Sequence, residues 1–589
     1  MLDPRIYRAA LVVVVLAAIV SAFALGNRPR PIGTTVPPDA FNGARARSDL
    51  DRLASQYPSR RPGSSGDDAM AAAIAAELRG ISHSYEVSTV SFGGETIDGD
   101  RTLKTVIARQ IGAPGPQLVV VAHRDAAGRG AKAELSGTAA MLEIARAVAD
   151  GRARRSITFV STSGGSGGNA GAADAVKRLG GPVDAVLVLG DLASVHARRP
   201  FVVGWSNSKG VAPLQLQRTI AAAVRSESGA YPGFPRGPVQ WARLAFPATV
   251  GEQGSFLSAG MPAALLSVTG ERPPAADSRV STRRLQSFGR AALRTIDALD
   301  NAPDLHESPT ADLLTLRKVI PAWTVRLMVL ALLLPPLLVT VDGFARARRR
   351  HAALGSGLRR HVVLGLPFLL AAAFAWFLGV TGLAGPTPPN PVDVTALPAG
   401  TRGAVVLCAI VLVLVLGWLV VRPAMSRRLG VTGAPDSEGA GIAMLMVLCV
   451  AALLMWLGNP YAAGLLVPAT HLWLLIVAPE LRMRRWLAIG LVLVALLPLA
   501  LVGLVFAHSL ALGPLDFAWW LFLLVGGEHI GPWAWIVWSA LAACLLVAIS
   551  LAWRERRPRV EEEPRVTVRG PVTYAGPGSL GGTESALRQ

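Results

Sequence analysis

Long apolar segments fill the second half of the chain. A helix needs about 20 apolar residues to cross a bilayer, so residues 321–553 are predicted to form seven transmembrane helices. Their approximate bounds are Ala322–Val341, Val362–Leu383, Gly403–Val421, Gly441–Leu457, Ala462–Ala478, Trp486–Ala507 and Pro532–Trp553. The run Phe517–Val525 is too short to cross, and we expect a re-entrant or interfacial segment there.

A further apolar segment lies near the N-terminus, from Leu11 to Leu25, with Arg5 and Arg8 before it. This pattern favours a signal anchor within residues 1–26 that forms the first transmembrane helix. The small residues around Ala22-Phe23-Ala24 leave a cleaved signal peptide as the alternative.

Residues 27–320 have a different pattern. Short apolar runs, Gln117–Ala122 and Ile157–Val160, alternate with helix-like stretches such as Ala69–Leu78 and Ala139–Ala149. Strand followed by helix, repeated, predicts an α/β fold. We call residues 27–320 the α/β domain. The polar, Gly/Ser-rich residues 554–589 predict a disordered tail.

The composition and the distribution of charge indicate how these parts lie relative to a membrane. Of 589 residues, 51% are hydrophobic and 16% are charged, which is typical of a membrane protein. The formal net charge is +19, and twelve of the fourteen arginines in residues 321–553 lie in three loops, near Arg346–Arg360, Arg422–Arg428 and Arg482–Arg485. The positive-inside rule puts these loops in the cytoplasm.

This distribution predicts a multi-pass protein of the plasma membrane. Both termini are then cytoplasmic, and the α/β domain is extracytoplasmic. The arginines are explained by topology, so no nucleic-acid partner is expected, and the lipid bilayer is the predicted surrounding. The three cysteines, Cys408, Cys449 and Cys544, lie in apolar runs and offer neither a disulfide framework nor a cysteine zinc site.

Candidate chemistry lies in the α/β domain. The segment Val121-Ala122-His123-Arg124-Asp125 puts His123 and Asp125 at the end of an apolar strand, where α/β folds bind ligands. A helix begins near Ser136, and the glycine-rich turn Gly164-Gly165-Ser166-Gly167-Gly168 follows the next strand. A His-x-Asp pair alone is weak evidence for a site.

Together with the opening Tyr57-Pro58-Ser59-Arg60-Arg61-Pro62-Gly63-Ser64, the order of these motifs resembles the zinc-dependent aminopeptidase family, which includes secreted bacterial aminopeptidases and glutaminyl cyclases. The resemblance covers residues from about 41 to about 300. It implies a mixed sheet with helices on both faces. It also implies two zinc ions held by His, Asp and Glu side chains, a bridging Asp, and a Glu that acts as general base on the bridging water.

Two family positions are retained. His123 stands where the first ligand is expected, with Asp125 placed to orient its imidazole. Asp191, in Leu189-Gly190-Asp191, matches the later Asp ligand.

The other positions have changed. Ala133 aligns with the bridging Asp, Gly165 and Ser166 stand where the Glu-Glu pair is expected, and Gln253 occupies the place of the last His. Lys132 brings a positive charge to the expected metal site. Without the bridging ligand and the base, hydrolysis should be lost.

The resemblance therefore implies a pseudo-peptidase with no cofactor. One zinc on His123 and Asp191, helped by Glu134 or Glu252, stays open. The vestigial cleft is expected to bind a peptide, a glycan, a lipid-linked group or a protein partner.

Polar residues of the membrane half are candidates too, because such residues are expensive in a bilayer. His471, Asp516, Glu528 and His529 are predicted to line an outward-facing groove, with solvated interfacial positions as the alternative.

The architecture also resembles the peptidase-like subunit of the eukaryotic GPI transamidase and the membrane-bound peptidases of the endoplasmic reticulum. The Ala/Arg-rich composition favours a bacterial source instead. Three hypotheses follow: a non-catalytic binding or scaffold protein, a membrane-anchored metallo-aminopeptidase with rearranged ligands, and a transporter or lipid-handling protein with an accessory outer domain.

Overall fold

A computed structural model gives the structure of this protein. The predicted tail of residues 554–589 and Arg482 lie outside the described residues, which are 3–34, 38–149, 151, 153–303, 305, 308–315, 317–431, 438–478 and 483–553.

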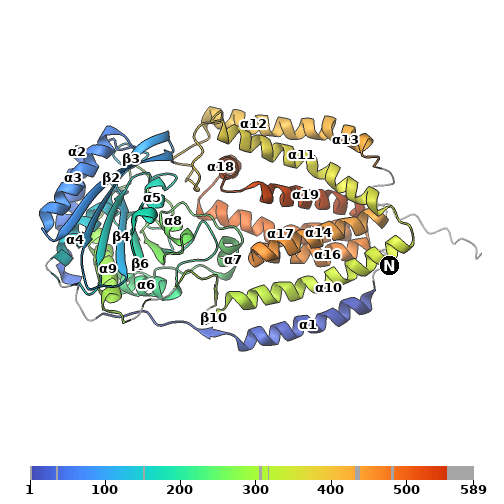
Figure 1. Cartoon of the computed structure of the whole chain (residues 1–589), viewed down its shortest axis with the longest axis horizontal. Helices are drawn as coiled ribbons and strands as arrows, with labels where there is room; N and C mark the ends of the chain where they lie inside the picture. The colour runs from blue at the N-terminus through green and yellow to red at the C-terminus, as the bar shows by residue number, and fades with distance from the viewer. Residues whose placement is uncertain are drawn as a thin grey trace, which may run out of the picture. The chain divides into compact units, whose positions relative to one another are not determined.

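The α/β domain is built on a sheet with the strand order β2-β3-β5-β4-β6-β8-β7 (Figure 1). Strands β5, β4, β6 and β8 are parallel to one another, whereas β2, β3 and β7 pair antiparallel. The predicted mixed sheet is confirmed, and both apolar runs are strands within it. The strands are β2 (Tyr85–Thr96), β3 (Gly99–Gln110), β4 (Gln117–His123), β5 (Ile157–Thr162), β6 (Val183–Leu189), β7 (Val202–Val203) and β8 (Ala263–Leu266).

Helices cover both faces of this sheet (Figure 1). One face carries α3 (Ser65–Ile81), α4 (Ser136–Ala149), α6 (Leu214–Ser228) and α9 (Thr282–Asn301), with α2 (Gly43–Gln56) packed over α4 and α9. The other face carries α5 (Ala170–Arg178) and α8 (Gln253–Ser258). The central strands are buried on both sides, which explains their continuous apolar sequence.

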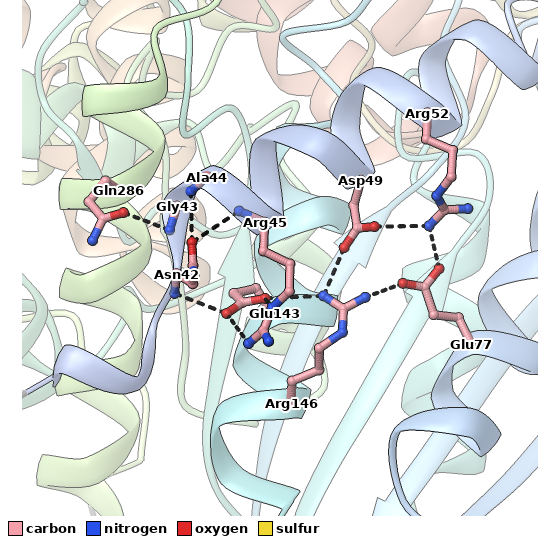
Figure 2. A network of polar contacts seen from close by, with 10 residues as sticks. All are labelled: Asn42, Gly43, Ala44, Arg45, Asp49, Arg52, Glu77, Glu143, Arg146 and Gln286. Atoms are coloured by element: carbon pink, nitrogen blue, oxygen red, sulfur yellow. Dashed lines mark hydrogen bonds and ion pairs between the residues drawn. The ribbon is translucent and has the colours of Figure 1, made fainter.

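A network of charged side chains joins α2, α3 and α4 (Figure 2). Glu143, fully buried, accepts hydrogen bonds at 2.7 Å from Nε and Nη2 of Arg45. Arg146 pairs with Glu143, Asp49 and Glu77, and Arg52 pairs with the last two. Each carboxylate here therefore faces at least two guanidinium groups or amides.

The second half of the chain is a helical bundle. The described residues contain eight helices, α1 included, that are long and apolar enough to cross a membrane, as predicted. The shorter α18 (Pro514–Gly526) matches the predicted non-spanning run. The bundle elements are α10 (Ala322–Arg349), α11 (Leu354–Val380), α12 (Gly400–Leu416), η2 (Gly417–Val421), α13 (Arg422–Arg428), α14 (Glu438–Gly458), α15 (Pro460–Gly464), α16 (Val467–Val477), α17 (Arg485–Ser509) and α19 (Pro532–Ala552).

The N-terminal helix α1 (Pro4–Phe23) belongs to this bundle. It packs along α10, and the hydroxyl of Tyr7 lies 2.7 Å from Nδ1 of His471 on α16. Asp3 pairs with Arg346 at 3.1 Å. After α1, β1 (Gly26–Asn27) pairs with β10 (Lys318–Ile320), which also pairs with β9 (Leu313–Leu314).

The α/β domain and the bundle share an apolar core around α7 (Gly237–Ala245). Nε1 of Trp241 donates to the backbone of Tyr461 at 3.0 Å. Arg243, almost fully buried, donates to Glu271 and to the Ser509 hydroxyl, and its guanidinium lies 4.6 Å from the ring centroid of Phe506. The α/β domain is therefore docked on the bundle rather than tethered by a linker.

Candidate functional site

The candidate residues gather at the carboxyl edge of the sheet. His123 ends β4, the turn Gly164–Gly168 follows β5, and Asp191 follows β6. These strands are parallel, so their carboxyl ends meet at one edge. The cleft there encloses about 50 Å³, enough for a few water molecules. Its lining includes His123, Glu134, Gly165, Ser166, Asp191, Glu252, Arg272 and Asp393.

His123 lies between two glutamates. Its Nε2 is 3.4 Å from Oε1 of Glu134, and its Nδ1 is 3.7 Å from Oε2 of Glu252. Burial alone would lower the pKa of His123, but the two carboxylates outweigh it and raise the pKa well above 6.5. The cleft therefore favours the protonated form of His123, with both ring nitrogens directed at carboxylates.

Asp125 does not orient this imidazole as the sequence predicts. Its carboxylate accepts hydrogen bonds at 3.0 Å from the backbone amides of Gly165 and Ser166, and another at 2.5 Å from the Ser166 hydroxyl. Asp125 thus fixes the glycine-rich turn after β5. The prediction was wrong because sequence spacing does not show which way a side chain turns at the strand end.

The position of the general base has no room for a side chain. A Cβ placed on Gly165 would lie 2.4 Å from Cβ and 2.6 Å from Cγ of His123. No real pair of carbon atoms approaches so closely without a shift of the backbone. His123 therefore occupies the space into which a residue at 165 would project.

The bridging position is equally changed. Ala133 is completely buried in the loop before α4, and its carbonyl accepts from the Ser136 hydroxyl. The neighbouring Glu134 carries its carboxylate into the cleft instead. Lys132 forms an ion pair with Asp51 of α2, so the expectation that its charge occupies the metal site was wrong.

Asp191 lines the cleft, and its carboxylate accepts hydrogen bonds mainly from backbone amides. Its Oδ1 accepts from the amides of Ala193 and Ser194 at 2.9 and 2.8 Å and from the Ser136 hydroxyl at 3.2 Å. Burial raises the pKa of Asp191 to about 6, against the lowering effect of these hydrogen bonds. Its other oxygen, Oδ2, is buried without a hydrogen-bond partner among the described residues.

Near α8, only one of the two adjacent residues Glu252 and Gln253 lines the cleft. Gln253, in the place of the last His, donates to Thr249 at 2.9 Å and to the backbone of Trp205 at 3.2 Å, and it does not line the cleft. Glu252 lines the cleft and accepts from the Thr162 hydroxyl at 2.6 Å. The structure thus brings together His123, Glu134 and Glu252, with Asp191 in the same cavity, and leaves Gln253 outside.

The polar candidates of the bundle hold separate local contacts. His471 contacts Tyr7 and the carbonyl of Leu332, while Asp516 accepts from the amide of Gly513 and caps its own helix. Glu528 accepts from Nε1 of Trp376, and a ring nitrogen of His529 lies 2.9 Å from the carbonyl oxygen of Pro247. The four residues thus make separate contacts, and the outward-facing groove stays a prediction.

Comparison with known proteins identifies the α/β domain. Residues 105–229 match the model of peptidase family M28. The α/β domain therefore contains a segment similar to this family, and we call residues 27–320 the M28 domain below. No curated protein matches the chain.

Solved structures similar to this M28 domain include three enzymes. The LapA aminopeptidase of Legionella pneumophila is 16% identical, with a TM-score of 0.37 over 45% of this chain and 73% of that one. The zinc aminopeptidase BSAP of Bacillus subtilis is 12% identical, with a TM-score of 0.35 over 44% and 94%. The glutaminyl cyclase of Bacteroides thetaiotaomicron is 15% identical, with a TM-score of 0.36 over 47% and 100%.

The M28 family suggests zinc, but the residues of this cleft do not fit a zinc pair. A methyl group at Ala133 cannot bridge two metals, and no carboxylate stands at position 165. Within the described ranges, no group of three or more His, Cys, Asp or Glu side chains has an arrangement that could hold a metal ion. We therefore derive no chemical step through a zinc pair.

Sequence reasoning missed two residues of the cleft, Arg272 and Asp393. Arg272 follows β8, and Asp393 comes from the loop between α11 and α12 of the bundle; their Nε and Oδ2 atoms are 3.5 Å apart. Neither belongs to a motif. Only the docking of the bundle on the M28 domain brings Asp393 to the cleft.

Proposed function

We propose that the M28 domain is a non-catalytic binding module carried on a membrane-spanning bundle. The observation that carries this proposal is the contact between Gly165 and His123. The general base must project from position 165, and the imidazole fills that space. A water molecule in this cleft has neither a metal pair to lower its pKa nor a carboxylate at 165 to take its proton.

The charges of the cleft support the same proposal. In a metal site, His123 would be neutral and would offer a lone pair to the ion. Here the imidazolium is itself the cation between Glu134 and Glu252. The cleft retains polar groups that can recognise a peptide, a glycan, a lipid-linked group or a protein partner.

An activity assay tests this proposal. The full chain, purified in detergent, is assayed with aminoacyl and peptide substrates in the presence of added zinc, beside a His123→Ala variant. The proposal predicts the same background rate for both proteins. Hydrolysis by the natural chain that His123→Ala removes would contradict it.

For the membrane half, we propose that α1 is retained as a transmembrane helix in the plasma membrane, with both termini in the cytoplasm. The contacts of α1 with α10, of Tyr7 with His471 and of Asp3 with Arg346 support retention, because cleavage would expose the partners of α1 to lipid. The intact mass of the purified chain tests it: loss of about the first 15 to 30 residues, the usual length of a signal peptide, would contradict retention.

A second candidate, a single-metal site with rearranged ligands, is favoured by one observation. Nε2 of His123, Oδ2 of Asp191 and Oε2 of Glu252 are buried and lack hydrogen-bond partners in the described part of the chain. In the described structure these groups do not form a metal-binding arrangement, so a cation in the cavity would require His123 to give up its proton and the carboxylates to move toward the ion. Zinc titration of the full chain, compared with a Glu134→Gln, Glu252→Gln double variant, decides: binding lost in the variant supports the candidate, and no binding by either rejects it.

The transporter hypothesis gains no comparable support. His471, Asp516, Glu528 and His529 each contact a neighbour of their own rather than a shared path.

A further inference from the structure

A proline-rich loop of the bundle lies against the cleft. It connects α11 to α12 and contains the segment Pro386-Thr387-Pro388-Pro389-Asn390-Pro391-Val392-Asp393. Much of this segment is buried, including Thr387, Val392 and Asp393. Prolines lack a backbone N–H, so such a segment can be buried with few donors left to satisfy.

The loop contacts the glycine-rich turn that replaces the family's Glu-Glu pair. Nδ2 of Asn390 donates to the carbonyl oxygen of Gly168 at 2.9 Å. A Cβ on Gly168 would lie 2.7 Å from Cβ of Pro388, and one on Gly167 would lie 3.3 Å from Cγ1 of Val392. Glycine at position 168 permits the loop to approach, whereas at position 167 a Cβ would meet Cγ2 of Ile97 first, at 2.3 Å.

The loop also places a carboxylate at the cleft. Asp393 is 2% exposed and lines the cavity, and it faces Arg272 at 3.5 Å. The amide of Thr395 donates to its Oδ1 at 2.8 Å and fixes its direction. The loop is thus held by a hydrogen bond at the turn and by an ion pair at the opposite wall.

We propose that this loop is an intramolecular plug that closes the cleft of the M28 domain. Asp393 of this loop lines the cavity, so a ligand that fills the space beside His123 and Glu252 would have to displace the end of the loop. Both ends of the loop continue into predicted transmembrane helices, so a displacement of α12 against α11 moves the plug. Only 11% of the apolar window of Gly400–Arg428, which contains α12, is buried in the described structure, and α12 packs mainly on α11, with a smaller contact to α18.

This proposal goes beyond the proposed function, because a plug would limit access to a catalytic or a non-catalytic cleft alike. It is tested by the accessibility of a thiol in the cleft. Ser166 lines the cavity and is 6% exposed. The full chain with Ser166→Cys and with Cys408→Ser, which removes the exposed native thiol, is labelled with a maleimide in detergent.

The loop variant Asn390→Ala, Asp393→Asn removes both attachments. We expect it to raise the labelling rate of the thiol at position 166 by about tenfold or more, because local opening governs access to a buried group. Asp516→Asn is the matched control; it alters a carboxylate of the bundle that caps its own helix, and the rate should stay within about twofold of the parent.

Arg272→Met breaks the same ion pair from the M28 domain and leaves the loop sequence intact. It should also raise the labelling rate, and it decides the outcome if the loop variant does not fold. If the loop variant folds and its labelling rate is unchanged, the plug proposal is overturned. If the loop variant does not fold, an unchanged labelling rate in Arg272→Met overturns the proposal. Because the readout involves neither metal nor hydrolysis, this result is independent of the test of the proposed function.

Discussion

The M28 domain contains two clusters of charged side chains that differ in how well their atoms are satisfied. Around Glu143, on the helices α2, α3 and α4, each carboxylate is matched by guanidinium groups at ion-pair distance (Figure 2). In the cleft the ion-pair contacts are longer, with His123 at 3.4 Å from Glu134 and at 3.7 Å from Glu252, and Oδ2 of Asp191 has no hydrogen-bond partner within the described residues. Both clusters are largely buried.

The two clusters differ in what they contribute: the first supports the fold, whereas the second is suited to binding a ligand. Buried polar groups that only support the fold are normally satisfied; in the first cluster even Oδ2 of Asp49, which makes no hydrogen bond, lies 2.7 Å from Nη1 of Arg146. Unsatisfied polar atoms beside a cavity cost stability, and that cost is typical of sites that hold a ligand. The cleft therefore lacks the ligands of a zinc pair, but unlike an ordinary protein core it still contains an unsatisfied polar atom beside a cavity.

The largest effect is expected in the satisfied cluster. Arg146→Met should lower the free energy of unfolding by about 3 kcal/mol, because Glu143, Asp49 and Glu77 each lose a partner. The midpoint of thermal unfolding of the full chain should fall accordingly. Arg47→Met, which breaks a partly exposed pair with Asp51 on the same α2 helix, is the control and should cost less than about 1 kcal/mol. Equal decreases in the free energy of unfolding for Arg146→Met and Arg47→Met would contradict this prediction.

Restoring the missing base should damage the cleft. Gly165→Glu should destabilise the domain by about 2 kcal/mol, because its Cβ collides with His123. Gly165→Ala separates this steric part from the added charge. Neither variant should hydrolyse aminoacyl substrates with zinc present; hydrolysis by Gly165→Glu would show that the base alone is missing.

The third prediction concerns pH. Asp191 has a folded-state pKa of about 6 against an ordinary 3.8, so its ionisation opposes folding, and this cost grows between about pH 4 and pH 6 and stays level at higher pH. Asp191→Asn should therefore stabilise the chain by about 2 kcal/mol above pH 6. The gain should vanish below about pH 4, where both states bind the proton. Thermal unfolding at pH 4 and pH 7.5 checks this, and an equal effect at both values would contradict it.

The smallest expected effect is a change in the pKa of one side chain, His123. Glu252→Gln should lower the pKa of His123, because one of the two carboxylates that outweigh burial is removed. NMR of histidine-labelled protein measures this pKa. Glu227→Gln, which alters a carboxylate paired with Arg294, should leave it unchanged. An unchanged pKa in Glu252→Gln would mean that Glu252 does not hold the imidazolium.

Local patterns predicted most of the fold. The transmembrane helices and the strands β4 and β5 follow from runs of apolar residues, which depend only on neighbours in sequence. The order of motifs around His123, Gly165 and Asp191 placed the cleft correctly at the carboxyl edge of the sheet.

The remaining features depend on distant contacts. The side chains of Lys132 and Asp125 turn toward Asp51 and the Gly165 turn, which no spacing in the sequence reveals. The approach of Asn390 to Gly168 joins residues 222 positions apart, and it requires the M28 domain to be docked through α7. Such contacts arise from packing, and a single sequence carries no local signal for them.

The central claim is that this cleft holds an internal cation where its family is expected to hold zinc. The most direct test is the zinc content of the full chain, purified from zinc-supplemented cells and measured by mass spectrometry beside His123→Ala. The account predicts zinc well below one equivalent in both proteins. Two equivalents in the natural chain, lost in His123→Ala, would contradict it.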